Sequence, residues 1–180
     1  GDAASAVGAL EATLENTRSG RADGRGQRSR DTARGRTWVT RRDIKVDRIS
    51  SAWLIRRFID SEARFRFVDA DDFVLADDEL RFDMFDAEFT HVGDRCTFEV
   101  LLERFAIDDR ALESIAEVVH DIDLKDGKFG REETPGIERV LTAIARAYPD
   151  DGARLERGRQ LFDELYALYA LHATEGTGAP

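Results

Sequence analysis

Two of the three histidines in the sequence follow a glutamate by three positions. Glu88 precedes His91 and Glu117 precedes His120, so both segments read Glu-x-x-His. On a helix, residues three apart share a face, so each segment can present a carboxylate and an imidazole together, as in the metal sites of helical bundles. The second segment is expected to be helical. The first is also compatible with a strand, on which positions three apart point to opposite faces and the pair separates.

More acidic residues follow the second histidine, because Asp121 and Asp123 lie close behind His120. A histidine among carboxylates suits a divalent or trivalent transition metal of intermediate hardness, such as iron, manganese or zinc. In the alternative interpretation, the acids cap and solvate a helix end, and the helix dipole favours the histidine there. The predicted metal ligands are Glu88, His91, Glu117, His120, Asp121 and Asp123.

A lone thiol lies five positions after His91. Arg95 directly precedes it, and Cys96 is the only cysteine of the chain. A neighbouring cation lowers the pKa of a thiol, so this segment could form a reactive or redox-sensing pocket. A buried cysteine instead behaves as a small hydrophobic residue, and the sequence leaves both interpretations open.

Arginines on a predicted helix are the third candidate group. Asp47 and Arg48 lie at its start, and Arg56 and Arg57 follow about two turns later. Guanidinium groups bind oxyanions through charge-assisted hydrogen bonds, although surface arginines more commonly pair with neighbouring acids. The predicted oxyanion or effector ligands are Arg48, Arg56, Arg57, Arg95 and Cys96.

The elements that position these residues follow from the hydrophobic pattern. Alternating residues predict strands, and apolar residues at helical spacing predict helices, the first of them capped near Asp47. The predicted strands are 37–41, 64–69 and 80–85, with 88–91 either strand or helix. The predicted helices are 48–60, 96–105, 109–121, one after Pro135, and 151–171. We therefore expect an α/β or α+β fold with a small sheet and a helix-rich C-terminal half.

The composition limits the function classes. The chain carries a formal net charge of -10 with 42% apolar residues, so as a whole it repels nucleic acid and anionic lipid. It has one cysteine, no apolar run long enough to span a membrane and no recognisable signal peptide at its start. These features predict a cytoplasmic protein. The absence of an initiator methionine suggests a piece of a longer protein.

The domain organisation follows from changes in composition. Residues 1–17 are predicted to be a helix from the end of a preceding region, and the Arg- and Gly-rich residues 18–36 a flexible linker. Residues 37–172 are the predicted folded domain and 173–180 a disordered tail. An apolar stripe on the last helix is interpreted as core or as the face of a homodimer. It consists of Leu155, Phe162, Leu165, Tyr166 and Tyr169.

Three segments carry a resemblance to a known family. They are TWVTRRDIKVDRISSAWLIRRFID (37–60), FDMFDAEFTHVGDRCTFEVLL (82–102) and VVHDIDLKDGKFG (118–130). Together they resemble the C-terminal domain of the chromate-resistance protein ChrB family, from about residue 37 to 171. The resemblance implies the effector-sensing domain of a chromate-responsive transcriptional regulator, which would contact DNA only through an N-terminal domain absent here.

The resemblance leaves the effector open. Chromate, a related oxyanion or a metal ion would bind between the helix of Arg48 and the region of His91 and His120. The alternative is a metal-binding protein or metalloenzyme in chromate or oxidative-stress resistance. No Ser-His-Asp order or Gly-rich phosphate loop is present, so no catalytic residue is assigned and an enzyme is the less favoured class.

Overall fold

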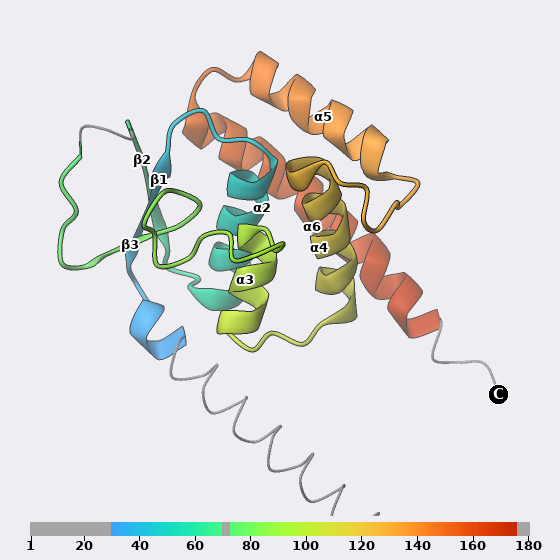
Figure 1. The fold of residues 1–180 in the computed structure, drawn as a ribbon, viewed down its shortest axis with the longest axis horizontal. Helices are drawn as coiled ribbons and strands as arrows, with labels where there is room; N and C mark the ends of the chain where they lie inside the picture. The colour runs from blue at the N-terminus through green and yellow to red at the C-terminus, as the bar shows by residue number, and fades with distance from the viewer. Residues whose placement is uncertain (1–29, 70–72, 176–180) are drawn as a thin grey trace, which may run out of the picture.

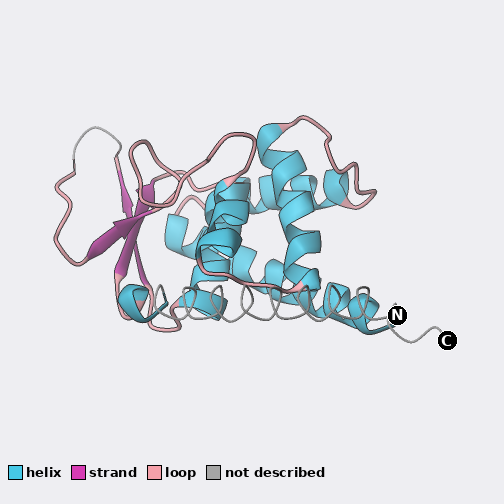
Figure 2. Ribbon diagram, turned by 60° about the horizontal axis from the view of Figure 1, so that its bottom comes forward, coloured by secondary structure: helices cyan, strands magenta, loops and turns pink. Residues whose placement is uncertain are grey.

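A computed structural model of the chain describes residues 30–69 and 73–175. A small sheet lies at one side of the domain, and the helices fill the remainder (Figures 1 and 2). The strands are β1 (Thr37–Arg41), β2 (Arg64–Val68) and β3 (Glu79–Arg81). The helices are α2 (Val46–Leu54), the π-helix η1 (Ile55–Ile59), α3 (Thr97–Arg104), α4 (Arg110–Leu124), α5 (Thr134–Ala147) and α6 (Asp151–Glu175). The predicted small sheet and helix-rich C-terminal half are confirmed.

The sheet is parallel, with the order β2-β1-β3. Parallel strands need a long crossover, and α2 with η1 supplies it between β1 and β2. Both faces of β1 are covered. Trp38 points into the main core, whereas Val39 packs on the other face with Val68 and Met84. Between β1 and α2, which carries Asp47, the backbone N–H groups of Asp43 and Ile44 donate to the Asp151 carboxylate of α6.

The main core surrounds α2. Trp53 on this helix stacks on Phe162 of α6, with 5.5 Å between the ring centroids, and lies parallel to Phe98 of α3. The stripe predicted on the last helix belongs to this core, since Leu155, Phe162 and Tyr169 are buried and Leu165 and Tyr166 pack against it. The core interpretation of that stripe is therefore confirmed.

The close crossing of α6 over α2 yields a first prediction. A Cβ added at Gly158 would lie 2.2 Å from Cγ2 of Ile49, which is buried. Gly158→Ala is expected to destabilise the domain by about 1–3 kcal/mol through overpacking, measured by urea unfolding. Gly136→Ala on α5 is the control. Its Cβ would meet nothing within 4 Å, so there the gain in helix propensity should stabilise the domain. Equal effects of both substitutions would contradict the packing described.

The packed domain begins before residue 37. Residues 30–33 are helical and Ala33 is buried, while the backbone N–H groups of Gly35 and Arg36 donate to the Asp60 carboxylate. The flexible linker predicted for 18–36 is thus wrong for 30–36. Burial of Ala33 and the two backbone hydrogen bonds to Asp60 attach this Arg-rich segment to the folded domain. The predicted helix 1–17 and the remainder of the linker lie outside the described residues.

Several element ends also differ from the prediction. Helix α6 continues to Glu175, beyond the expected start of the tail, and 176–180 lie outside the described residues. The strand expected over 80–85 ends at Arg81, and 88–91 form neither helix nor strand apart from an isolated bridge at Phe89. Among the described residues, no helix combines the length and apolar character needed to cross a membrane.

Candidate metal centre

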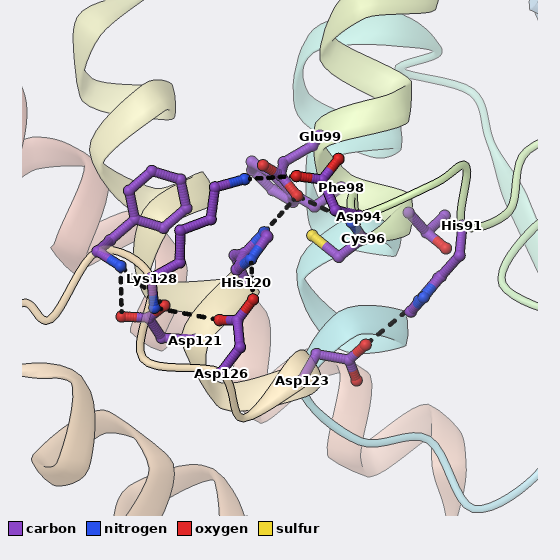
Figure 3. A network of polar contacts seen from close by, with 12 residues as sticks. His91, Asp94, Cys96, Phe98, Glu99, His120, Asp121, Asp123, Asp126 and Lys128 are labelled. Carbon is purple, nitrogen blue, oxygen red and sulfur yellow. Dashed lines mark hydrogen bonds and ion pairs between the residues drawn. The ribbon is translucent and has the colours of Figure 1, made fainter.

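Three carboxylates surround one nitrogen of His91. Nε2 of this residue lies 3.0 Å from Asp47 Oδ2, 3.2 Å from Asp123 Oδ2 and 3.5 Å from Asp83 Oδ1. Asp47 comes from α2, Asp123 from the last turn of α4, and Asp83 from the loop after β3. The His91 imidazole reaches Asp123 from a loop on the other side of the site (Figure 3). Four segments that are distant in sequence thus meet at one point.

This arrangement offers more acceptors than the imidazole can satisfy. Nε2 carries at most one hydrogen, which makes one good hydrogen bond, yet three carboxylate oxygens lie within 3.5 Å of it. A metal ion with ligands at 2.0–2.2 Å holds neighbouring ligand atoms about 3 Å apart. The spacing between His91 and the oxygens of Asp47 and Asp123 matches that requirement.

The charges in the cluster favour a cation. Arg48 pairs with Asp83 at 3.1 Å and offsets one negative charge. With a neutral imidazole, Asp47 and Asp123 leave two further negative charges that a divalent ion would neutralise. Carboxylate oxygens with one imidazole nitrogen suit iron, manganese or zinc.

Titration behaviour reflects the same negative potential. Hydrogen bonds to Asp123 and then Asp47 raise the pKa of His91 to about 10. Burial, followed by repulsion from Asp47, raises the pKa of Asp83 to about 6. The negative potential of the cluster therefore favours bound positive charge. Without a metal ion, a proton on His91 supplies part of that charge.

Asp47 is fixed in place by the first turn of α3 together with Ser51 of its own helix. Its buried carboxylate accepts hydrogen bonds from the backbone N–H groups of Thr97 (2.9 Å) and Phe98 (3.1 Å), and from Ser51 Oγ. The N-cap position of α2 is Lys45, without a side-chain cap. The predicted capping of α2 near Asp47 is thus wrong. The carboxylate accepts hydrogen bonds from the first turn of α3, which fixes its position beside His91.

The second predicted histidine lies in a separate network (Figure 3). The side chain of His120 is fully buried, with Nδ1 2.8 Å from Glu99 Oε2 and Nε2 3.2 Å from Asp126 Oδ2. Burial lowers the pKa of His120, but the hydrogen bonds to Glu99 and Asp126 outweigh it and raise the pKa. Each ring nitrogen of His120 has one carboxylate partner, whereas three carboxylate oxygens converge on Nε2 of His91.

The acids near His120 stabilise the loop after α4. Asp121 accepts hydrogen bonds from the backbone N–H groups of Phe129 and Gly130. Glu117 pairs with Arg131 at 2.7 Å, so the second Glu-x-x-His pattern is helical as predicted but does not converge on one site. Although donor atoms of His120, Asp121 and Asp126 lie near one another, their contacts indicate a structural role.

The two histidine networks meet at the N-terminus of α3. Asp47 accepts from Thr97 N and Phe98 N, and Glu99 accepts from Cys96 N at 2.8 Å while also bonding His120. Each network thus holds part of one helix end. The networks of His91 and His120 are consequently both coupled to helix α3.

The remaining predicted residues have other partners. Glu88 accepts from the backbone and side chain of Arg81, away from His91. Arg56 donates to Ala63 O and lies over Phe65, while Arg57 pairs with Asp163 and Arg95 with Glu103. Only Arg48 of the predicted arginines reaches the His91 cluster. Asp83, Glu99 and Asp126 had not been selected as site residues from the sequence.

Cys96 is not placed for reactivity. Its side chain is buried at the N-cap of α3, and burial strongly raises the pKa of the thiol. We expect Cys96 in the folded domain to resist a thiol-specific reagent and to react fully once the chain is unfolded in denaturant, because the thiolate is the reacting form. Stoichiometric labelling of the native domain at the rate of a free thiol would contradict the description of this site.

Comparison with known proteins places these features in a family. The sequence profile described as ChrB, C-terminal domain, matches residues 38–169. Protein ChrB of Cupriavidus metallidurans is 41% identical over 137 residues, which cover 76% of this chain and 41% of that relative. The chain thus spans about two fifths of the length of the relative. No solved structure matches the chain significantly.

Proposed function

This chain belongs to the family of the ChrB C-terminal domain, and on that premise we propose that it is an effector-sensing domain in chromate resistance. Its effector is a transition-metal cation bound by Asp47, His91 and Asp123, with Asp83 and Arg48 beside them. The proposal joins the sensing role implied by the family with two of the metal ligands predicted from the sequence, His91 and Asp123, to which the fold adds Asp47. In the full-length regulator, this domain would control a DNA-binding region that precedes it.

The observation that carries the proposal is the convergence of three carboxylate oxygens on Nε2 of His91. A dianion such as chromate would meet repulsion from Asp47, Asp83 and Asp123 at this point, whereas a cation gains from all three. Arg48, already paired with Asp83, and a protonated His91 together offset only two of these three negative charges. The cluster thus favours the metal ion over the oxyanion among the effectors considered.

Helix α3 offers a route for the signal. The carboxylate of Asp47 binds its first turn, and the carbonyl oxygen of Phe105 at its other end accepts a hydrogen bond from Arg30 Nη2 at 3.0 Å. Arg30 belongs to the helical turn 30–33, which leads to the residues before the domain. Eight helical residues span about 12 Å, so a shift of Asp47 on metal binding can move the attachment of the preceding segment.

The proposal is tested by titrating the metal-free chain with Mn²⁺, Fe²⁺ and Zn²⁺ in a calorimeter. We expect one saturable site for at least one of these ions, and elemental analysis of the loaded chain should give one ion per chain. We also expect metal binding to change the rate of proteolysis on the N-terminal side of Arg30, and an Arg30→Ala variant should bind the ion with the same affinity but lose that change. No saturable binding of any of the three ions would refute the proposal.

A further inference from the structure

Thr97, the first residue of α3, binds two carboxylates of the His91 cluster at once. Its backbone N–H donates to Asp47 Oδ2 at 2.9 Å, and its side-chain Oγ1 donates to Asp83 Oδ1 at 3.2 Å. These are the same two oxygens that lie 3.0 and 3.5 Å from Nε2 of His91. Thr97 is fully buried, so water does not compete for its hydroxyl. One residue therefore positions both oxygens relative to the histidine.

The hydroxyl of Thr97 acts against a repulsion between the two carboxylates. Asp47 and Asp83 both place an oxygen within 3.5 Å of the same His91 nitrogen, and like charges at such short range repel each other. Asp47 is held by further donors, including the backbone N–H of Phe98, so its position does not depend on the hydroxyl. The oxygen of Asp83 that faces the histidine is the one that accepts from Thr97 Oγ1. The hydroxyl thus mainly determines where Asp83 Oδ1 lies.

Asp83 lies at the margin of the site, where its exact position matters. Its Oδ1 is 3.5 Å from Nε2 of His91, compared with 3.0 Å for Asp47 and 3.2 Å for Asp123. Ligand atoms that bind one metal ion at 2.0–2.2 Å lie about 3 Å apart, so Asp83 is slightly too distant in the present arrangement. Its backbone is held by the hydrogen bond from its N–H to Phe89 O at 2.8 Å. A small movement of the side chain therefore decides whether Asp83 reaches the ion.

The presence of Asp83 in the ligand set affects which ion the site favours. Zn²⁺ is satisfied by three protein ligands and a water molecule, and Asp47, His91 and Asp123 already offer three. Mn²⁺ prefers an octahedral environment rich in oxygen, so a further carboxylate contributes more to its binding. Zn²⁺ generally binds a given site more tightly than Mn²⁺ does. Asp83 is thus expected to reduce the preference for Zn²⁺ over Mn²⁺.

We infer that Thr97 is a positioning residue that determines the metal specificity of the centre: its hydroxyl keeps Asp83 available as a fourth ligand and thereby raises the affinity for Mn²⁺ more than that for Zn²⁺. This inference rests on the proposed function and adds the class of ion that the site favours. Thr97 acts through Asp83 and is not itself a ligand. Arg48 also pairs with Asp83, at 3.1 Å, but through the other oxygen, Oδ2. Because the hydroxyl is uncharged, its removal leaves the net charge of the site unchanged.

The test compares the Mn²⁺ and Zn²⁺ affinities of the wild type with those of Thr97→Val and Thr97→Ser. Free Mn²⁺ is measured by electron paramagnetic resonance, and Zn²⁺ by competition with a chromophoric chelator. Thr97→Val keeps the shape of the side chain without the hydroxyl, so Mn²⁺ affinity should fall at least about tenfold and Zn²⁺ affinity less than about threefold. Thr97→Ser keeps the hydroxyl and should restore the ratio of the two affinities to within about threefold of the wild type. A general loss of stability would weaken both ions alike, so the ratio distinguishes positioning from a purely structural role.

The matched control is Thr40→Val in β1. Thr40 is also fully buried, and its hydroxyl has no hydrogen-bond partner within residues 30–69 and 73–175, so both affinities should stay within about twofold of the wild type. An unchanged affinity ratio in Thr97→Val, or an equal change in Thr40→Val, would overturn the inference while the metal centre stands. Binding of Zn²⁺ without Mn²⁺ by the wild type would do the same. If the wild type binds neither of these ions nor Fe²⁺, the proposed function fails and this inference fails with it.

Discussion

Replacing Asp47 by alanine is expected to destabilise the domain by about 3–5 kcal/mol. The side chain is 2% exposed and accepts hydrogen bonds from Thr97 N, Phe98 N and Ser51 Oγ. Its removal leaves two buried N–H groups of α3 without an acceptor and His91 without its closest carboxylate. Urea unfolding followed by circular dichroism measures the loss. Asp47→Asn keeps one acceptor oxygen, so its free energy of unfolding should lie between those of Asp47→Ala and the wild type. If Asp47→Ala does not fold, Asp47→Asn should still fold with a lower free energy of unfolding than the wild type.

The control for this prediction is Asp123→Ala. Asp123 also contacts His91, but its side chain is 27% exposed and caps no helix. Its replacement should change the free energy of unfolding by less than about 1 kcal/mol. Equal losses for Asp47→Ala and Asp123→Ala would show that Asp47 does not stabilise the N-terminus of α3 in the way described.

Replacing His91 by alanine is expected to weaken transition-metal binding by at least about 100-fold, and the metal-free variant should also be less stable than the wild type at neutral pH, because the clustered carboxylates lose a protonated partner. His91 supplies the only nitrogen ligand of the cluster, and losing even an outer partner of a metal ligand typically weakens affinity 10- to 100-fold. The side chain is 36% exposed, so its truncation leaves no large buried cavity. Competition with a chromophoric chelator gives the metal affinity of the wild type and the variant.

The matched control is Glu88→Gln, which removes a carboxylate three positions from His91. Because Glu88 pairs with Arg81, its loss should leave metal affinity within about two- to threefold of the wild type. An effect of Glu88→Gln as large as that of His91→Ala would restore the Glu-x-x-His interpretation of this segment. A normal affinity in His91→Ala would instead place the metal elsewhere.

The sequence predicted the helices well because their apolar spacing determines them. The segments around Trp53, Phe98 and Ile115 each form the expected helix, and their apolar faces meet in one core. Strand β1 was also predicted from its alternation, although both of its faces are buried. The attachment of residues 30–36 was missed, because it depends on hydrogen bonds to Asp60 and the burial of Ala33. Neither the hydrogen bonds to Asp60 nor the burial of Ala33 produces a recognisable pattern in the neighbouring sequence.

The candidate site was only partly predictable, because it is assembled across the fold. His91 and Asp123 were selected from local acidic and histidine patterns, and both lie in the cluster. Asp47 was interpreted as a cap of its own helix, since sequence spacing cannot show that the start of α3 lies beside it. Asp83 has a positive φ after a strand shorter than expected, and nothing around it in the sequence marks it as a ligand.

A Zn²⁺-loaded crystal structure with anomalous diffraction at the zinc edge tests the metal centre most directly. We expect one strong anomalous peak within about 2.0–2.2 Å of His91 Nε2 and of carboxylate oxygens of Asp47 and Asp123. The contrary result is a fully loaded crystal whose peak lies at His120 and Asp126, or on the surface, while the His91 cluster keeps its present contacts.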